Sequence, residues 1–325
     1  MQGMSFDFNL AFPRAWGAPP VTAQLKVAPE DFYVEERLDF ELANSGEHLY
    51  LFVEKRDQNT QTVAEHIARM AKVSPGDVSY AGMKDRRAVT RQWFSVYLPK
   101  NNDFAWQAVP DCEMTLLSFA RHHKKLRRGE HAANFFRIQL REVDGDSDAL
   151  LRRLALVAEH GVPNYFGEQR FGYQSSNLRD IERFLGKAKG KQQGFQDRLK
   201  VSAMRSWLFN TVLALRVQHQ SWQQPIEGDP ESYPSAPLWG RGRLSSSVPL
   251  REWENTVMQE LVTWCNFLEH CGLQQERRSC VLKAEQFRYE IMGNNLCLEF
   301  VLAPGAYATS LIREIAEIGN RLSLE

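Results

Sequence analysis

The chain has 325 residues, and its 40 Lys and Arg balance 40 Asp and Glu, so the formal net charge is zero. Hydrophobic residues make up 43% and charged residues 25%, which is typical of globular proteins and excludes collagen-like, coiled-coil and generally disordered chains. No apolar run reaches the roughly 20 residues that span a bilayer, and the N-terminal residues lack a secretory pattern, so we expect a cytoplasmic protein of about two domains.

The first third of the chain predicts a mixture of strands and helices. Strands are expected at 26–36 and 48–56, where aromatic and β-branched residues predominate. A helix is expected from about Thr60, with apolar residues every three or four positions and an end at Pro75. A loop that holds Asp85 follows this helix.

The middle of the chain differs in character from both ends. Its first motif, NYFGEQRFG at 164–172, is rich in aromatic residues and glycine. The last part returns to strands joined by a hairpin turn. The further elements expected in chain order are strands at 92–98 and 135–143, helices at 147–160, 201–219 and 253–269, strands at 287–292 and 296–302, and a helix from about Ala308.

The sequence contains no motif for a nucleotide or metal cofactor. It has no P-loop, no glycine-rich dinucleotide loop, no nucleophile elbow and no HExxH pattern. Its five cysteines are odd in number and form no CxxC pair, which disfavours a disulfide scaffold and a structural zinc site. These observations disfavour nucleotide-driven motors, dinucleotide oxidoreductases and serine hydrolases, and we expect neither a cofactor nor a metal.

The zero net charge hides an uneven distribution of charge. Residues 29–48 contain seven acids and one Arg, whereas residues 121–137 contain six Lys or Arg, three His and one Glu. The basic run could neutralise phosphates, and the Asn and Phe residues at its end could hydrogen-bond and stack on an unpaired base. A solvated basic loop followed by core phenylalanines explains the same residues, and the pattern alone leaves both interpretations open.

Three further positions have a chemical and a purely structural interpretation. Asp85 lies among cations, and an ionised carboxylate on a loop can act as nucleophile or base, but an isolated Asp more often caps a turn. Arg170 could bind phosphate or belong to a packed turn. Tyr307 could lie beside an anionic ligand at a helix start, or could simply begin the helix. The cations near Asp85 are Lys84, Arg86, Arg87 and Arg91.

Three segments, YAGMKDRRAVTRQWF, GVPNYFGEQRFG and PGAYATSLIRE, occur in the same order as in the TruD family of tRNA pseudouridine synthases. The chain resembles that family over nearly its whole length. The resemblance implies an α+β protein with the pseudouridine synthase catalytic fold, a mixed and mostly antiparallel sheet with helices. A family-specific α/β insertion domain would occupy 161–281, between catalytic segments at 1–160 and 282–325.

The resemblance also implies the activity, isomerisation of uridine to pseudouridine at position 13 in the D-stem of tRNA. The uracil is detached from C1′ at N1, rotated while bound and rejoined through C5, without a cofactor or metal. Asp85 matches the catalytic aspartate of the family, and Lys26 matches a basic residue near it. Asn134 and Phe136 match an Asn-x-Phe pair whose ring would stack on the target base. Tyr307 falls where the family usually has Phe.

The expected partner is therefore tRNA, with no membrane and no nucleotide cofactor. The sequence leaves the oligomeric state open, and a monomer is compatible with it. Residues assigned to substrate phosphates are Lys124, Arg127, Arg128 and Arg170. The main alternative is a non-catalytic tRNA-binding or RNA-folding module on the same scaffold. A hydrolase with paired carboxylates is a further alternative, but no second acid is evident for it. The sequence leaves open whether Asp85 attacks C1′, attacks the base or removes a ribose proton.

Overall fold

The computed structural model describes residues 8–99, 104–110, 112–179, 181–187 and 194–319. The chain forms two compact units, each built from several segments. The sheet unit comprises Val21–Ser147, Ala284–Gly305 and Glu317–Glu325, and the helical unit comprises Met1–Pro20, Asp148–Lys283 and Ala306–Ala316. The insertion expected at 161–281 lies within the helical unit, which also takes in chain from both sides of it. The assignment of catalytic and insertion domains stays a prediction.

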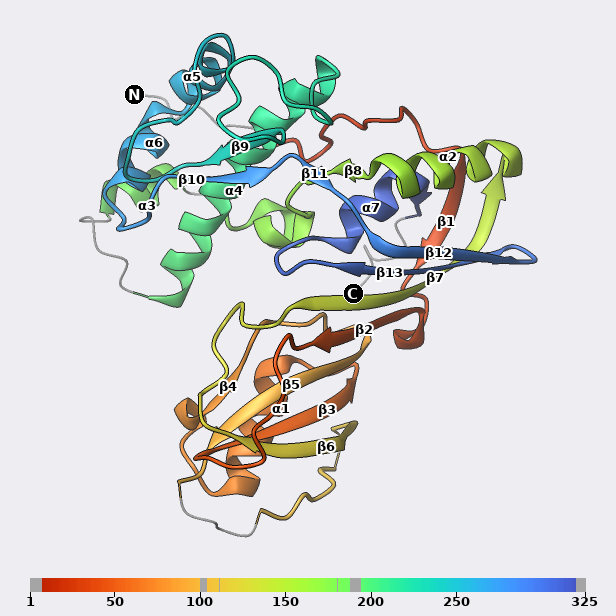
Figure 1. The fold of residues 1–325 in the computed structure, drawn as a ribbon, viewed down its shortest axis with the longest axis vertical. Coiled ribbons are helices and arrows are strands. Elements are labelled where there is room, and N and C mark those ends of the chain that lie inside the picture. The colour runs from red at the N-terminus through yellow and green to blue at the C-terminus, as the bar shows by residue number, and fades with distance from the viewer. Residues whose placement is uncertain (1–7, 100–103, 111, 180, 188–193, 320–325) are drawn as a thin grey trace. The chain divides into compact units, whose positions relative to one another are not determined.

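The sheet unit is built on one ten-stranded sheet (Figure 1). Its main path runs β12-β13-β7-β2-β5-β3-β6, while β1, β4 and β14 pair beside this path. Among the described pairings whose direction is known, β2–β5 is parallel and the others are antiparallel, so the expected mixed, mostly antiparallel sheet is confirmed. Its strands are β1 (Val21–Leu25), β2 (Phe32–Arg37), β3 (His48–Arg56), β4 (Val78–Tyr80), β5 (Val89–Tyr97), β6 (Met114–His122), β7 (Ala133–Gly145), β12 (Glu285–Met292), β13 (Asn295–Leu302) and β14 (Ala316–Ile318).

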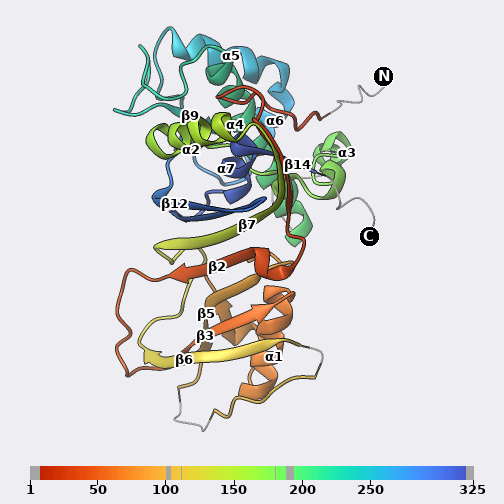
Figure 2. The same ribbon diagram turned by 90° about the vertical axis from the view of Figure 1, so that its right-hand side faces the viewer.

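Helix α1 (Thr60–Ala71) covers one face of β3, β4 and β5, and Figure 2 shows it beside β3 and β5. Val63, Ala64 and Ile67 from the expected apolar stripe are buried against this face. The helix ends where Lys72 adopts a left-handed conformation (φ 54°). Burial of this stripe fixes which face of the sheet is internal, and that face carries the buried side chains of β2, β3 and β7 described below.

The helical unit packs around α4, whose buried side chains contact those of α5 and α6. The single helix expected at 253–269 is instead two helices, because the backbone leaves the helical region at Leu261 (φ −122°, ψ 33°). No Gly or Pro marks this break, so the periodicity could not locate it. The elements are α2 (Ser147–His160), α3 (Ile181–Lys187), α4 (Phe195–Gln218), α5 (Leu250–Glu260), α6 (Val262–Glu269) and α7 (Ala308–Ile315), with strands β8 (Val162–Pro163), β9 (Ser235–Leu238), β10 (Glu276–Ser279) and β11 (Val281–Leu282).

The described helices include none that is both long and apolar enough to cross a membrane.

Candidate active site

Asp85 lies in the loop between β4 and β5, and the backbone of this loop is tied down on two sides. Lys55, fully buried on β3, donates hydrogen bonds from Nζ to the carbonyl oxygens of Asp85 (3.0 Å) and Gln58 (2.7 Å). The backbone N–H of Lys84 donates to Oγ1 of Thr60, the first residue of α1 (3.0 Å). The carboxylate therefore projects from a loop whose position is set by the sheet and by α1.

The carboxylate of Asp85 is paired with the ammonium of Lys26. Oδ2 of Asp85 lies 2.8 Å from Nζ of Lys26, and the two side chains are 37% and 16% exposed. The same ammonium lies 4.0 Å from the centroid of the Phe32 ring. Lys26 itself has a positive φ (57°), which L-residues seldom adopt and which often marks functional sites. Among the described residues Oδ1 of Asp85 has no partner, so one oxygen is available to a substrate.

A second group of polar side chains surrounds the amide of Asn134 at the start of β7. Nζ of Lys84 lies 2.7 Å from Oδ1 of Asn134 and 2.7 Å from Oε2 of Glu36. Nδ2 of Asn134 lies 3.0 Å from Nε2 of His131. All four side chains are almost entirely buried. The direct contact of Lys84 with Asn134 links the Asp85 loop to β7.

Burial changes the pKa values of two members of this group. It raises the pKa of Glu36, against the opposing effect of the Lys84 ammonium. Burial lowers the pKa of His131 to about 4, and the charge of Lys84 adds to this effect. His131 is therefore neutral near pH 7, and one of its ring nitrogens can accept a hydrogen bond.

Phe136 follows Asn134 on the same face of β7, two residues along the strand. Its ring stacks on Phe300 (centroids 5.4 Å apart) and meets Phe32 edge-on (6.1 Å). Phe136 is 7% exposed, whereas Phe135 points to the opposite face of the sheet. One of the two phenylalanines thus belongs to the internal face, as strand alternation requires, and stacking of Phe136 on a base stays a prediction.

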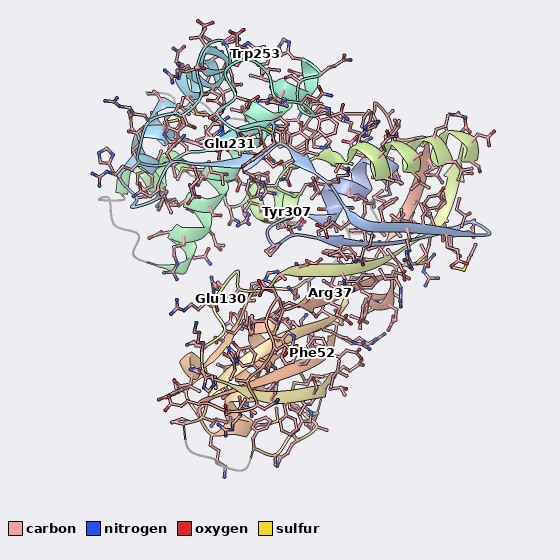
Figure 3. All side chains as sticks on the ribbon, in the orientation of Figure 1. Arg37, Phe52, Glu130, Glu231, Trp253 and Tyr307 are labelled. Carbon is pink, nitrogen blue, oxygen red and sulfur yellow. The ribbon has the colours of Figure 1, made fainter. Side chains whose placement is uncertain are left out.

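The basic loop, residues 123–130, carries three of the residues assigned to phosphates. It is anchored by Leu126, which is fully buried, and it ends at Glu130 (Figure 3). The backbone N–H of Gly129 donates to the carbonyl of Ala81 (2.8 Å), at the beginning of the Asp85 loop. The structure therefore brings the basic loop against the loop that carries the carboxylate. The exposed cations are Lys124, Arg127 and Arg128, together with Lys125.

Arg170 and Tyr307 contact each other in the helical unit. Arg170 lies in the 3-10 helix Glu168–Phe171 and donates from Nε to Oη of Tyr307 (2.8 Å) and from Nη1 to Oγ of Ser202 (2.9 Å). The Tyr307 ring, just before α7 (Figure 3), meets Phe166 edge-on at 5.8 Å. The hydroxyl group of Tyr307 thus serves to position the guanidinium of Arg170.

The sequence interpretation missed the buried charged residues that hold the site together. Glu36 follows Phe32 and Val34 on the internal face of β2, and Lys55 follows Val53 on the internal face of β3. A charge at a position where alternation expects an apolar residue signals a buried ion pair or hydrogen-bond network, because an unpaired buried charge is very costly. That signal was present in the sequence.

The geometry in the sheet unit suits chemistry on a small planar ring. It combines the half-exposed carboxylate of Asp85, which has the Lys26 ammonium at one oxygen, with the oriented amide of Asn134. The aromatic ring of Phe136 lies on the same face of β7 as this amide. An ionised carboxylate can act as nucleophile or general base, while amide and aromatic groups can bind a polar ring. The residues described contain no cluster of three or more His, Cys, Asp or Glu side chains that could hold a metal ion.

Comparison with known proteins finds relatives that match nearly the whole chain. The family model for tRNA pseudouridine synthase D (TruD) matches residues 12–196 and 230–315. A tRNA pseudouridine synthase D of Cellvibrio japonicus is 47% identical over 321 residues, which are 97% of this chain and 95% of the relative. One from Pseudomonas syringae pv. syringae is 40% identical over 339 residues, covering 96% of each chain.

The fold is also similar to that of a solved structure. The crystal structure of a protein described as a tRNA pseudouridine synthase D from Methanosarcina mazei matches with a TM-score of 0.68. The match covers 93% of this chain and 95% of the other, at 21% sequence identity. At that identity the likeness supports the fold alone.

Proposed function

Because the chain belongs to the TruD family of tRNA pseudouridine synthases, we propose that it isomerises uridine in tRNA with Asp85 as the catalytic carboxylate. The observation that carries the role of Asp85 is its half-exposed carboxylate on a loop anchored by Lys55, with Lys26 at one oxygen only. We assign the reaction to position 13 of the D-stem, as the family resemblance implies, and to the cytoplasm.

The reaction rearranges the bonds of one nucleotide without net loss of atoms. The bond between C1′ and N1 breaks, and a bond between C1′ and C5 forms. The proton on C5 is then lost to a base, and N1 gains a proton. Asp85 can begin this sequence by attacking C1′, by adding to the base or by removing a ribose proton, and each route needs the ionised carboxylate. Lys26 holds Oδ2 and leaves Oδ1 for the nucleotide.

The substrate uridine has to leave the base stack of its stem before the carboxylate can reach it. Enzymes that act on bases offset this cost, a few kcal/mol, by stacking and by hydrogen bonds to the base edge. We assign stacking to Phe136 and an edge contact to Asn134, which share the internal face of β7. Phosphate contacts would position the tRNA without reading its sequence. We assign these contacts to Lys124, Arg127, Arg128 and Arg170.

The test is release of tritium from tRNA transcripts labelled at C5 of uridine, because formation of the C1′–C5 bond displaces that hydrogen. We expect the wild-type protein to release about one tritium per transcript, and a transcript with cytidine at position 13 to release none. Salt-sensitive tRNA binding by folded protein without any release, at enzyme excess, would instead identify a non-catalytic tRNA-binding module.

A further inference from the structure

The carboxamide of Asn134 is fixed in one of its two orientations by the side chain of Lys84. An ammonium group has three hydrogens and no lone pair, so the atom 2.7 Å from Nζ of Lys84 has to be the oxygen of the amide. Lys84 is in turn held by Glu36 at 2.7 Å, in a pair that is 7% and 0% exposed. A half-turn of the amide would set its NH2 group against the ammonium of this buried pair, so that two donors would face each other.

His131 fixes the other end of the same amide. With Oδ1 facing Lys84, the NH2 group of Asn134 faces Nε2 of His131 at 3.0 Å, so this ring nitrogen acts as the acceptor. Acceptance requires a neutral imidazole, which agrees with the lowered pKa of His131. It also places the ring proton on Nδ1, a buried atom without a hydrogen-bond partner among the described residues. Asn134 therefore retains one N–H donor and one lone pair on Oδ1 for a ligand.

We propose that Lys84, Glu36 and His131 are positioning residues that hold Asn134 in the orientation that reads uracil and rejects cytosine. This inference rests on the proposed function and names the selectivity of the same site. Uracil presents acceptor, donor and acceptor in the order O4, N3–H, O2, so an amide N–H and oxygen can pair with one carbonyl and N3–H. Cytosine presents a donor at N4 and an acceptor at N3. In the same pose, the N–H of the fixed amide would face the N4 donor and its oxygen would face the N3 acceptor.

An amide that turned freely would lose this discrimination, because it could reverse and pair with cytosine equally well. The contacts of Lys84 and His131 with the amide, called the lock below, therefore allow only the orientation that distinguishes uracil from cytosine. When a buried acceptor faces an acceptor, or a donor faces a donor, a hydrogen bond is lost and the desolvated groups stay unpaired. This lowers affinity by about ten-fold or more.

The fixed amide also suits the rotation of the detached base. A half-turn of uracil about the axis through N3 and C6 exchanges N1 with C5 and O2 with O4, while N3–H stays in place. The order of acceptor, donor and acceptor is therefore unchanged by the turn. Asn134 can bind the ring before and after rotation with the same two groups, and its own orientation need not change.

The experiment measures tRNA affinity in an Asp85→Asn background, so that no base is converted during the measurement. Two transcripts are compared that differ only in uridine or cytidine at the target position. The double variant Lys84→Met/Glu36→Gln removes the lock without leaving a lone buried charge. We expect it to lower the preference for uridine over cytidine by about ten-fold. The matched control is Arg277→Met/Glu254→Gln, because that pair is also 2.7 Å apart and 7% and 0% exposed. It should leave the preference unchanged.

A second variant decides the matter if the double variant does not fold. Asn134→Asp can still accept from Lys84 but has no N–H to donate, so it should also lose the preference for uridine. An unchanged preference in a folded variant at either position would overturn the inference, as would an equal loss in the control pair. Failure of the proposed function would be seen separately, as absence of tritium release by the wild-type protein.

Discussion

Replacing Lys55 by Met tests whether the backbone of the Asp85 loop must be anchored for activity. Nζ of Lys55 donates to two main-chain oxygens, those of Asp85 at 3.0 Å and Gln58 at 2.7 Å, and the side chain is fully buried. Methionine has a similar length and stays apolar, but it cannot donate to either carbonyl. The change therefore removes the anchor while the carboxylate itself remains.

The effect of this change on overall stability is expected to be small. Two hydrogen bonds from a charged group contribute about 3–6 kcal/mol. Against this, burial lowers the pKa of Lys55 from 10.5 to about 8, so the buried charge carries a cost of its own that partly offsets these bonds. Methionine loses the bonds but avoids this cost, so the free energy of unfolding should fall by less than the bonds contribute.

The effect on catalysis should be much larger, because a misplacement of about 1 Å in a reacting group can cost about 100-fold in rate. We expect kcat for tritium release to fall about 100-fold in Lys55→Met, with KM for tRNA within about three-fold because the phosphate contacts remain. The control is Val53→Ala, two residues earlier on the same buried face, which costs about 2 kcal/mol in packing but removes no hydrogen bond to the loop.

The reasoning would be refuted if folded Lys55→Met kept kcat within about three-fold of the wild type. It would equally be refuted if Val53→Ala lost as much activity, because the loss would then reflect stability and not the anchor.

Two further predictions concern pH and salt. The folded pKa of His131, about 4, lies below its unfolded value of 6.5, so the unfolded chain binds more protons between these pH values. The free energy of unfolding, measured with urea, should therefore fall as pH drops from 6.5 to 4, by about 3 kcal/mol more in the wild type than in His131→Gln. Parallel pH profiles for the two proteins would contradict this. The tRNA affinity should fall with rising salt concentration despite the zero net charge. The triple variant Lys124→Ala/Arg127→Ala/Arg128→Ala should reduce the slope of log affinity against log salt concentration by about 2–3, whereas an unchanged slope would show that the loop is only solvated.

The regular elements were predictable where their signals are local. The strand expected at 48–56 is β3 (His48–Arg56), and the helix expected at 147–160 is α2 (Ser147–His160). Each has a continuous pattern of apolar residues and a clear end. Strand β6 was not expected, because it lies at the edge of the sheet and exposes much of its length, including Phe119 at 65%. An edge strand carries a weak alternation, so its pattern resembles a loop.

The site was predictable only in part, because most of its contacts join distant segments. The Asp85 loop and Asn134 could be recognised as candidates from their own neighbours in the sequence. The 2.8 Å pair between Lys26 and Asp85 joins residues 59 positions apart, and spacing alone cannot reveal it. The lock of Lys84 on Asn134 similarly depends on how the loop packs against β7. Pairing of this kind is set by the tertiary fold.

The role of Asp85 is tested most directly by tritium release from C5-labelled tRNA with the Asp85→Asn variant. Asparagine keeps the size and the main-chain anchor of the side chain but is neither a nucleophilic carboxylate nor a base. The account predicts release by the wild-type protein and none by the variant, with tRNA affinity within about three-fold because the phosphate contacts are retained. Near-normal release by folded Asp85→Asn would contradict the assignment of Asp85 as the catalytic residue.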